Sequence, residues 1–147
     1  MHTKVNQALE GGPCFALPSD MRIKVSPTGI YTYPDVVVVC GKPEFEDESR
    51  DVLLNPTVVI EVLSDSTEKY NRGTKFRHYQ QVASVREYVL VAQDQPLVER
   101  FVRQPDGDWL LTTFSGISGH MELLTGPARV PMADVYAGVT FPEHPPR

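Results

Sequence analysis

A glutamate inside an otherwise apolar run is the residue whose chemistry stands out. Glu61 lies within Val58-Val59-Ile60-Glu61-Val62-Leu63, a pattern typical of a strand covered on both faces. Strand alternation puts Glu61 on the same face as Val59 and Leu63. A buried ionised carboxylate is costly unless it is paired, hydrogen-bonded or bound to a metal. Two interpretations remain open: a structural pair with a lysine or arginine, and a functional carboxylate.

A second acid precedes another apolar run. Pro34-Asp35 comes directly before Val36-Val37-Val38-Val39. If the two apolar runs are adjacent central strands, Asp35 and Glu61 come together, and like charges that close need a cation between them. Two carboxylates, a backbone carbonyl and water are suitable ligands for Mg²⁺. Taken alone, Asp35 is more simply a turn residue after proline.

The densest positive cluster of the chain follows the strand that carries Glu61. Its members are Lys69, Arg72, Lys75, Arg77, His78 and, further on, Arg86. On a helix, Lys75 shares a face with Arg72 and with Tyr79. A solvated helix face is the ordinary explanation of such a run. The position directly after the strand of Glu61 also lets a lysine reach a water held at an acidic site.

Alternating apolar stretches and turn residues predict the elements that position these side chains. We expect a short helix over residues 2–10, a helix from about residue 64 to residue 82, and a helical turn over 132–136. We expect strands over 14–17, 21–25, 31–40, 57–63, 87–92 and 121–124, a turn at 26–29, an exposed acidic loop over 42–55, and a C-terminal β-hairpin that pairs 97–103 with 109–114. The pattern predicts an α/β fold with its two most apolar strands at the centre of the sheet.

Composition narrows the class of protein. The 147 residues fit a single domain spanning 1–147. The net charge of −5 provides no global attraction for nucleic acid, so any polyanion site must be local. No apolar run is long enough to span a membrane, and no signal peptide is recognisable at the start. Cys14 and Cys40 lack the spacing of a zinc site, and we interpret both as reduced thiols of a cytoplasmic protein, with a single bridge left open.

Four segments together resemble a known family. They are Tyr33-Pro34-Asp35-Val36-Val37-Val38-Val39, Pro56-Thr57-Val58-Val59-Ile60-Glu61-Val62-Leu63-Ser64-Asp65-Ser66-Thr67, Tyr70-Asn71-Arg72-Gly73-Thr74-Lys75-Phe76-Arg77-His78-Tyr79 and Val85-Arg86-Glu87-Tyr88-Val89-Leu90-Val91. In this order they resemble the Uma-type restriction endonuclease family, a branch of the PD-(D/E)XK nuclease superfamily. The resemblance extends from about Pro13 to Gly138.

The resemblance implies a restriction-endonuclease-like core, a central mixed sheet flanked by helices, and a Mg²⁺-dependent phosphodiesterase site in which Mn²⁺ can substitute. Asp35 and Glu61 are similar to the two metal-binding acids, and the carbonyl of Val62 would complete the inner shell. The superfamily lysine falls at Leu63 here, and in the Uma-type branch a lysine on the following helix is thought to replace it, which corresponds to Lys75. The bound metal would activate water, and Lys75 would orient that water or neutralise the transition state.

The implied partners are DNA and a second copy of the chain. Lys69 and Arg72 would lie near phosphate, and a two-fold pair of sites suits cleavage of both strands of a duplex. Two departures from the family pattern accompany this expectation. Asn71 stands where many members have an aspartate, and relatives usually begin with roughly forty further residues that include an acid at the metal site. The alternative is a catalytically inactive nuclease fold that serves as a dimerising or nucleic-acid-binding module.

Overall fold

The computed structural model describes residues 1–17, 20–25 and 29–141. In chain order the elements are α1 (His2–Ala8), β1 (Cys14–Leu17), β2 (Arg22–Val25), β3 (Ile30–Thr32), β4 (Val36–Cys40), β5 (Val52–Leu53), β6 (Val58–Val62), α2 (Glu68–Arg72), α3 (Thr74–Gln80), β7 (Glu87–Val91), β8 (Leu97–Arg103), β9 (Trp109–Ser115), β10 (His120–Leu123), β11 (Ala128–Pro131) and α4 (Met132–Val135). Of the turn expected at 26–29, residues 26–28 lie outside the described residues. Within the described ranges, no helix is long and apolar enough to cross a membrane.

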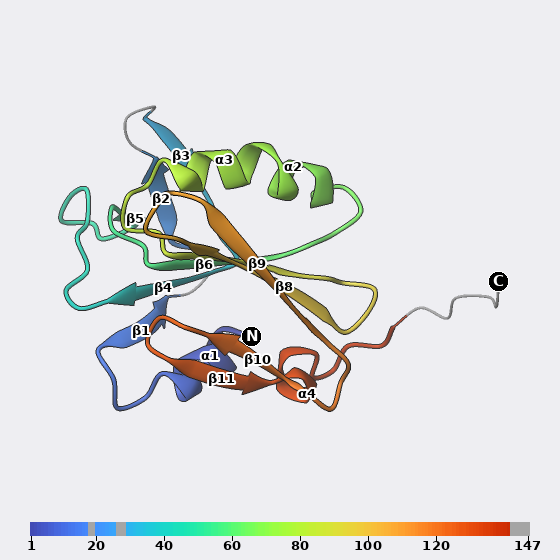
Figure 1. Cartoon of the computed structure of the whole chain (residues 1–147). Coiled ribbons are helices and arrows are strands. Elements are labelled where there is room, and N and C mark those ends of the chain that lie inside the picture. Colours follow the sequence, from blue (N-terminus) through green and yellow to red (C-terminus); the bar gives the residue numbers. More distant parts are fainter. Residues whose placement is uncertain (18–19, 26–28, 142–147) are drawn as a thin grey trace.

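A six-stranded mixed sheet forms the centre of the molecule (Figure 1). Its strand order is β1-β4-β6-β7-β8-β9, and β6 and β7 are the parallel pair. The apolar strands β4 and β6 are antiparallel neighbours, so the expected central pair is confirmed. The expected hairpin of β8 and β9 extends this sheet, while β10 and β11 form the hairpin that stands apart from it.

The sheet is covered on both faces, which explains the continuous apolar runs of its central strands. Even-numbered β4 residues such as Val36 and Val38 pack in the core shared with α1, β10, β11 and α4. Odd-numbered residues such as Val37 and Val39 pack in the other core, with α3 and the small sheet β3-β2-β5. Figure 1 shows the two layers on opposite sides of the central sheet. The α/β prediction is therefore confirmed.

Three expected elements differ in detail. The stretch 31–40 is two strands rather than one, because β3 pairs with β2 and β4 pairs with β1 and β6. The expected long helix is broken into α2 and α3 at Gly73, which is not helical. The acidic stretch 42–55 is not all exposed loop, because Val52 and Leu53 form the buried strand β5 beside β2.

The interpretation of the cysteines as reduced thiols is wrong. Cys14 and Cys40 form a disulfide across 26 residues of sequence. The cause is the antiparallel register of β1 and β4, in which Cys14 and Cys40 are direct partners. Disulfides are rare in a reducing cytosol. The cysteines therefore give no support to the expectation of a cytoplasmic location.

Candidate active site

The register of β4 and β6 brings the two candidate acids together. Val36 is paired with Ile60, so the next pair beyond the end of this ladder is Asp35 with Glu61. Directly opposed residues of antiparallel strands have their side chains on one face. The Asp35 Oδ2 atom accepts a hydrogen bond of 2.7 Å from the backbone N–H of Val62. Asp35 is thus fixed at the end of β6, beside the strand residue that carries the second carboxylate.

Lys75 completes the cluster from α3. Its Nζ atom lies 3.0 Å from Glu61 Oε2 and donates a second hydrogen bond of 2.9 Å to the backbone carbonyl of Tyr33. Lys75 and Tyr79 are one helical turn apart and both are buried, as their shared face predicts. The structure therefore brings together Asp35, Glu61 and Lys75. Tyr33 was missed, because a backbone acceptor leaves no signal in the sequence.

Glu61 is held in an unusual electrostatic state. Its other carboxylate oxygen, Oε1, is buried and has no hydrogen-bond partner among the described residues. Burial raises the pKa of Glu61 to about 7; the charge and hydrogen bond of Lys75 oppose this rise, and the charge of Asp35 adds to it. The carboxyl group thus changes charge near neutral pH. An unpartnered oxygen in such a site is a strong candidate ligand for a cation or a proton.

The donor set has the chemistry that Mg²⁺ prefers. The carboxylates of Asp35 and Glu61 are hard oxygen donors, and Glu61 Oε1 is an orphaned one. In a strand the N–H and C=O of one residue point to the same side, so the carbonyl of Val62 faces the same side as the N–H that binds Asp35. Within the described part of the chain, no three His, Cys, Asp or Glu residues form a metal-binding group. The fit is therefore to an ion that keeps several waters, as Mg²⁺ usually does.

Of the two residues expected near phosphate, Arg72 is already engaged. Its guanidinium makes a paired hydrogen-bonded contact with the carboxylate of Glu99 on β8, one branch of which measures 3.1 Å. Arg72 Nε also lies 3.6 Å from Glu68 Oε1. The charge of Arg72 is therefore largely compensated by ion pairs with two carboxylates of the same chain. Glu99 is far from Arg72 in sequence, and only the sheet places it there.

Lys69, the other expected phosphate contact, lies in a shallow hollow on α2 and α3. The hollow measures about 520 Å³ and is lined by Ser66, Lys69, Tyr70, Gly73, Thr74 and Arg77. Two cationic side chains and two hydroxyl groups line this hollow together with the exposed Tyr70. Such a combination suits a phosphate backbone and a base stacked on an aromatic ring. Arg77 was present in the basic cluster of the sequence but was not singled out for this role.

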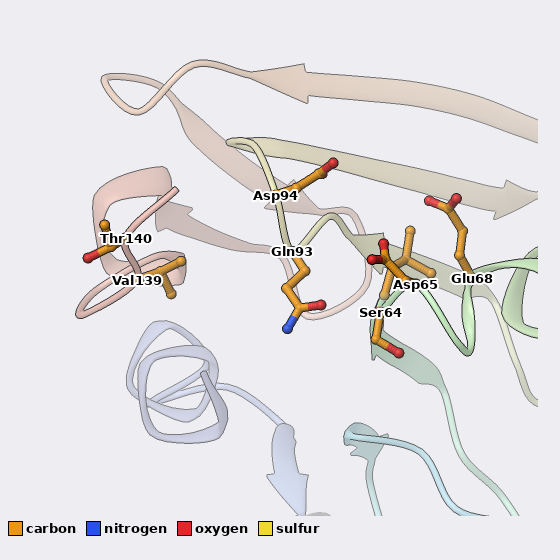
Figure 2. A pocket seen from close by; sticks show the side chains of 8 residues that line it. Ser64, Asp65, Glu68, Gln93, Asp94, Val139 and Thr140 are labelled. Carbon is orange, nitrogen blue, oxygen red and sulfur yellow. The ribbon is translucent and has the colours of Figure 1, made fainter. Parts of the chain in front are cut away.

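A second hollow lies at the carboxyl ends of the parallel strands β6 and β7. It measures about 390 Å³ and is lined by Leu63, Ser64, Asp65, Glu68, Gln93, Asp94, Val139 and Thr140. Figure 2 shows that the carboxylates of Asp65, Glu68 and Asp94 come from the two loops after the strands and from the start of α2. Three acids repel a phosphate backbone. The hollow at the ends of β6 and β7 is therefore acidic, whereas the hollow lined by Lys69 and Arg77 is basic.

Asn71, at the position where the sequence resemblance led us to expect an aspartate, is a buried residue of α2. Its backbone carbonyl accepts a hydrogen bond of 2.8 Å from the hydroxyl of Tyr88 on β7. Tyr88 in turn stacks on Phe76 of α3, with 4.7 Å between the ring centroids. These contacts fasten α2 and α3 to the sheet. Position 71 thus supports the helix that carries Lys75.

Comparisons with known proteins identify the family and the fold of this chain. The family model described as "Uma2: Putative restriction endonuclease" matches residues 1–133. Two uncharacterized proteins of Synechocystis sp. (strain ATCC 27184 / PCC 6803 / Kazusa), slr1290 and sll1609, are 35% and 36% identical over 133 and 104 residues. These matches cover 90% and 71% of this chain, and 68% and 59% of the two relatives.

A solved structure shares the fold. The crystal structure of a protein from Anabaena variabilis ATCC 29413, described as a putative nuclease belonging to DUF820, superposes with a TM-score of 0.71 at 15% identity. The match covers 92% of this chain and 75% of that one. The fold is therefore that of a nuclease-like protein. The residues matched by the family model include Asp35, Glu61 and Lys75. The chain belongs to the Uma2 family of restriction-endonuclease-like proteins.

Proposed function

We propose that this protein is a Mg²⁺-dependent endonuclease that hydrolyses phosphodiester bonds of DNA. The observation that carries the proposal is the buried carboxylate of Glu61, which uses one oxygen for Lys75 and has no partner for the other among the described residues. Asp35 lies opposite Glu61 in the register of β4 and β6. A purely structural ion pair would normally satisfy both oxygens. Asp35, Glu61 and the carbonyl of Val62 would hold the cation, and Mn²⁺ can replace Mg²⁺ in such an oxygen site.

The bound cation supplies positive charge to the scissile phosphate and lowers the pKa of water. The chain's own contribution is positional. The ammonium of Lys75 is held by Tyr33 and Glu61, so it is oriented before substrate arrives. From this position Lys75 would orient the attacking water or neutralise charge that develops on the phosphate. The hydrogen bond from Val62 keeps Asp35 in place without occupying its second oxygen.

The proposed substrate lies along the face of α2 and α3. Lys69 and Arg77 would contact phosphates, and Tyr70, which is 46% exposed, would stack on a base. Arg72, which we expected near phosphate from the sequence, would support this surface through its pair with Glu99 rather than contact DNA strongly. We further propose a homodimer, because cleavage of both strands of a duplex is matched by a two-fold pair of sites.

The proposal is tested by nicking of supercoiled plasmid in Mg²⁺ and in EDTA. We expect cleavage by the wild-type protein in Mg²⁺ alone, and background cleavage by Asp35→Asn and Glu61→Gln prepared in the same way. Glu122→Gln is the matched control, because Glu122 is a partly exposed carboxylate paired with Arg129 on the separate hairpin. Equal cleavage by Glu61→Gln and Glu122→Gln would refute the assignment.

A second candidate function is a catalytically inactive nuclease fold that binds nucleic acid or dimerises. It is favoured by one observation, that the ammonium of Lys75 already provides a counter-charge for the carboxylate of Glu61. On this alternative, DNA binding depends on Lys69 and Arg77 but not on Mg²⁺. Binding without any cleavage in Mg²⁺ or Mn²⁺, together with no effect of either ion on stability, would favour the module over the nuclease.

A further inference from the structure

The strand β9 is an unprotected edge of the central sheet. It ends the strand order β1-β4-β6-β7-β8-β9, and among the described residues its ladder is with β8. Its seven residues, Trp109-Leu110-Leu111-Thr112-Thr113-Phe114-Ser115, include no charged residue and no proline. Edge strands of monomeric proteins are usually protected by charges, proline, bulges or covering elements. β9 has none of the protections that its own sequence could provide.

The hydrogen-bonding direction of each β9 residue follows from the two ends of its ladder with β8. Gln104 N–H binds the carbonyl of Asp108, and Gly116 N–H binds the carbonyl of Pro96. Hydrogen-bonded pairs alternate along an antiparallel ladder, so the even-numbered residues of β9 bond to β8. The N–H and C=O groups of the odd-numbered residues, which include Leu111 and Thr113, therefore point away from the sheet.

Apolar side chains accompany this open edge. Leu110 is 58% exposed and Leu111 is 47% exposed, and as consecutive strand residues they lie on opposite faces of the sheet. Ile117, two residues beyond the strand, is 49% exposed. Exposed leucines on both faces of an edge strand are what a sheet continued by another strand would cover.

We propose that β9 pairs with β9 of a second copy, antiparallel, about a two-fold axis at Thr112. In this register Leu111 lies opposite Thr113 of the second copy, and both residues have outward-pointing backbone groups. Leu110 lies opposite Phe114 of the second copy, so Leu110 of each copy gains an aromatic cross-strand neighbour. The two-fold arrangement is closed, because each copy uses the same strand once.

The strand β9 carries no charge and is self-complementary in this register, and both properties suit a second copy as its occupant. The chain carries a net charge of −5, so two copies repel one another over most surfaces. β9 is a seven-residue segment without charge, and its Thr112-centred register places no like charges opposite one another. The central sheets of the two copies would become one continuous sheet, with the faces that carry α2 and α3 related by the two-fold axis.

This inference deepens the proposed homodimer by naming its surface. It is tested without DNA or metal, so its failure would leave the proposed metal site and cleavage activity untouched. Conversely, an inactive protein that dimerises through β9 would support this inference and refute the proposed function. The two proposals are therefore tested by separate measurements.

The test is the molar mass in solution, measured by light scattering after size exclusion over a range of concentrations. Thr113→Pro removes an outward-pointing N–H that β8 does not use, and proline is tolerated at such edge positions. Thr113→Val keeps the N–H and is the matched control. We expect wild type and Thr113→Val at twice 16.4 kDa, and Thr113→Pro at 16.4 kDa.

A second variant keeps the test informative if Thr113→Pro fails to fold. Leu110→Lys places a charge opposite Phe114 of the second copy, and Leu110 is 58% exposed within one copy. We expect this variant to be monomeric with an unchanged circular dichroism spectrum. A wild-type monomer at the highest concentration, a dimer that persists in Leu110→Lys, or open-ended assembly of the wild type would each overturn the proposal.

Discussion

Removing the ammonium of Lys75 should lower the free energy of unfolding, because the buried carboxylate of Glu61 then has no counter-charge. Lys75 Nζ and Glu61 Oε2 are 3.0 Å apart, and at an effective dielectric constant of about 20 this separation gives about 5 kcal/mol of attraction. Breaking a buried pair by removing one partner typically costs about 3–5 kcal/mol. We therefore expect Lys75→Met to lower the free energy of unfolding by about 3–5 kcal/mol at pH 8.

The loss should be smaller at pH 5. The pKa of Glu61 in the folded protein is about 7, above its ordinary value of 4.5, and loss of Lys75 raises it further. The folded state then binds more protons than the unfolded state between these two pKa values, so stability falls as pH rises, by up to about 1.4 kcal/mol per pH unit. At pH 5 the carboxyl group of the variant is neutral when folded, and most of the penalty disappears.

Urea unfolding followed by the fluorescence of Trp109, the single tryptophan, measures both effects. Lys24→Met is the matched control, because Lys24 forms a more exposed pair with Glu46 at 3.2 Å and should cost less than about 1 kcal/mol. Adding Glu61→Gln to Lys75→Met should recover much of the loss at pH 8. A Lys75→Met cost equal to that of Lys24→Met, or equal at pH 5 and pH 8, would refute the reasoning.

Two further predictions concern the disulfide and the basic hollow. Replacing both Cys14 and Cys40 with serine should lower the free energy of unfolding by about 3 kcal/mol, because the bridge closes a loop of 26 residues in the unfolded chain. A urea midpoint unchanged from wild type would contradict this prediction. The salt dependence of duplex DNA binding is the slope of the logarithm of the binding constant against the logarithm of salt concentration. Lys69→Ala and Arg77→Ala should each reduce the magnitude of this slope by about 1, whereas Arg72→Ala should change it less. Fluorescence anisotropy measures the slopes, and equal slopes for all three variants would contradict the proposed surface.

The central part of the fold was predictable because its signals are local. The apolar runs around Val36–Cys40 and Val58–Val62 predict buried strands in the middle of the sheet, which is where they lie. The break at Gly73 and the strand Val52–Leu53 were not predicted. A two-residue strand has too few residues to show a period, and its pairing with β2 and its bridge to Phe45 depend on tertiary structure.

The candidate site was predictable in its members but not in its contacts. Glu61 is conspicuous because a carboxylate in an apolar strand needs a partner. Lys75 was identified by the family resemblance, and helical spacing puts it on one face with Tyr79. The carbonyl of Tyr33 and the pairing of Arg72 with Glu99 depend on tertiary register, which no spacing in the sequence reveals. The same register made the disulfide, because it alone places Cys14 opposite Cys40.

The metal site is the central claim, and thermal unfolding with Mn²⁺ tests it most directly. At a concentration of 100 times the dissociation constant, a bound ion raises the melting temperature by about 5–10 °C in a chain of this size. The account predicts such a rise for the wild-type protein at pH 8, a smaller rise at pH 6 where Glu61 is protonated, and none for Asp35→Asn or Glu61→Gln. An unchanged melting temperature of the wild type, or an equal rise in Glu61→Gln, would contradict it.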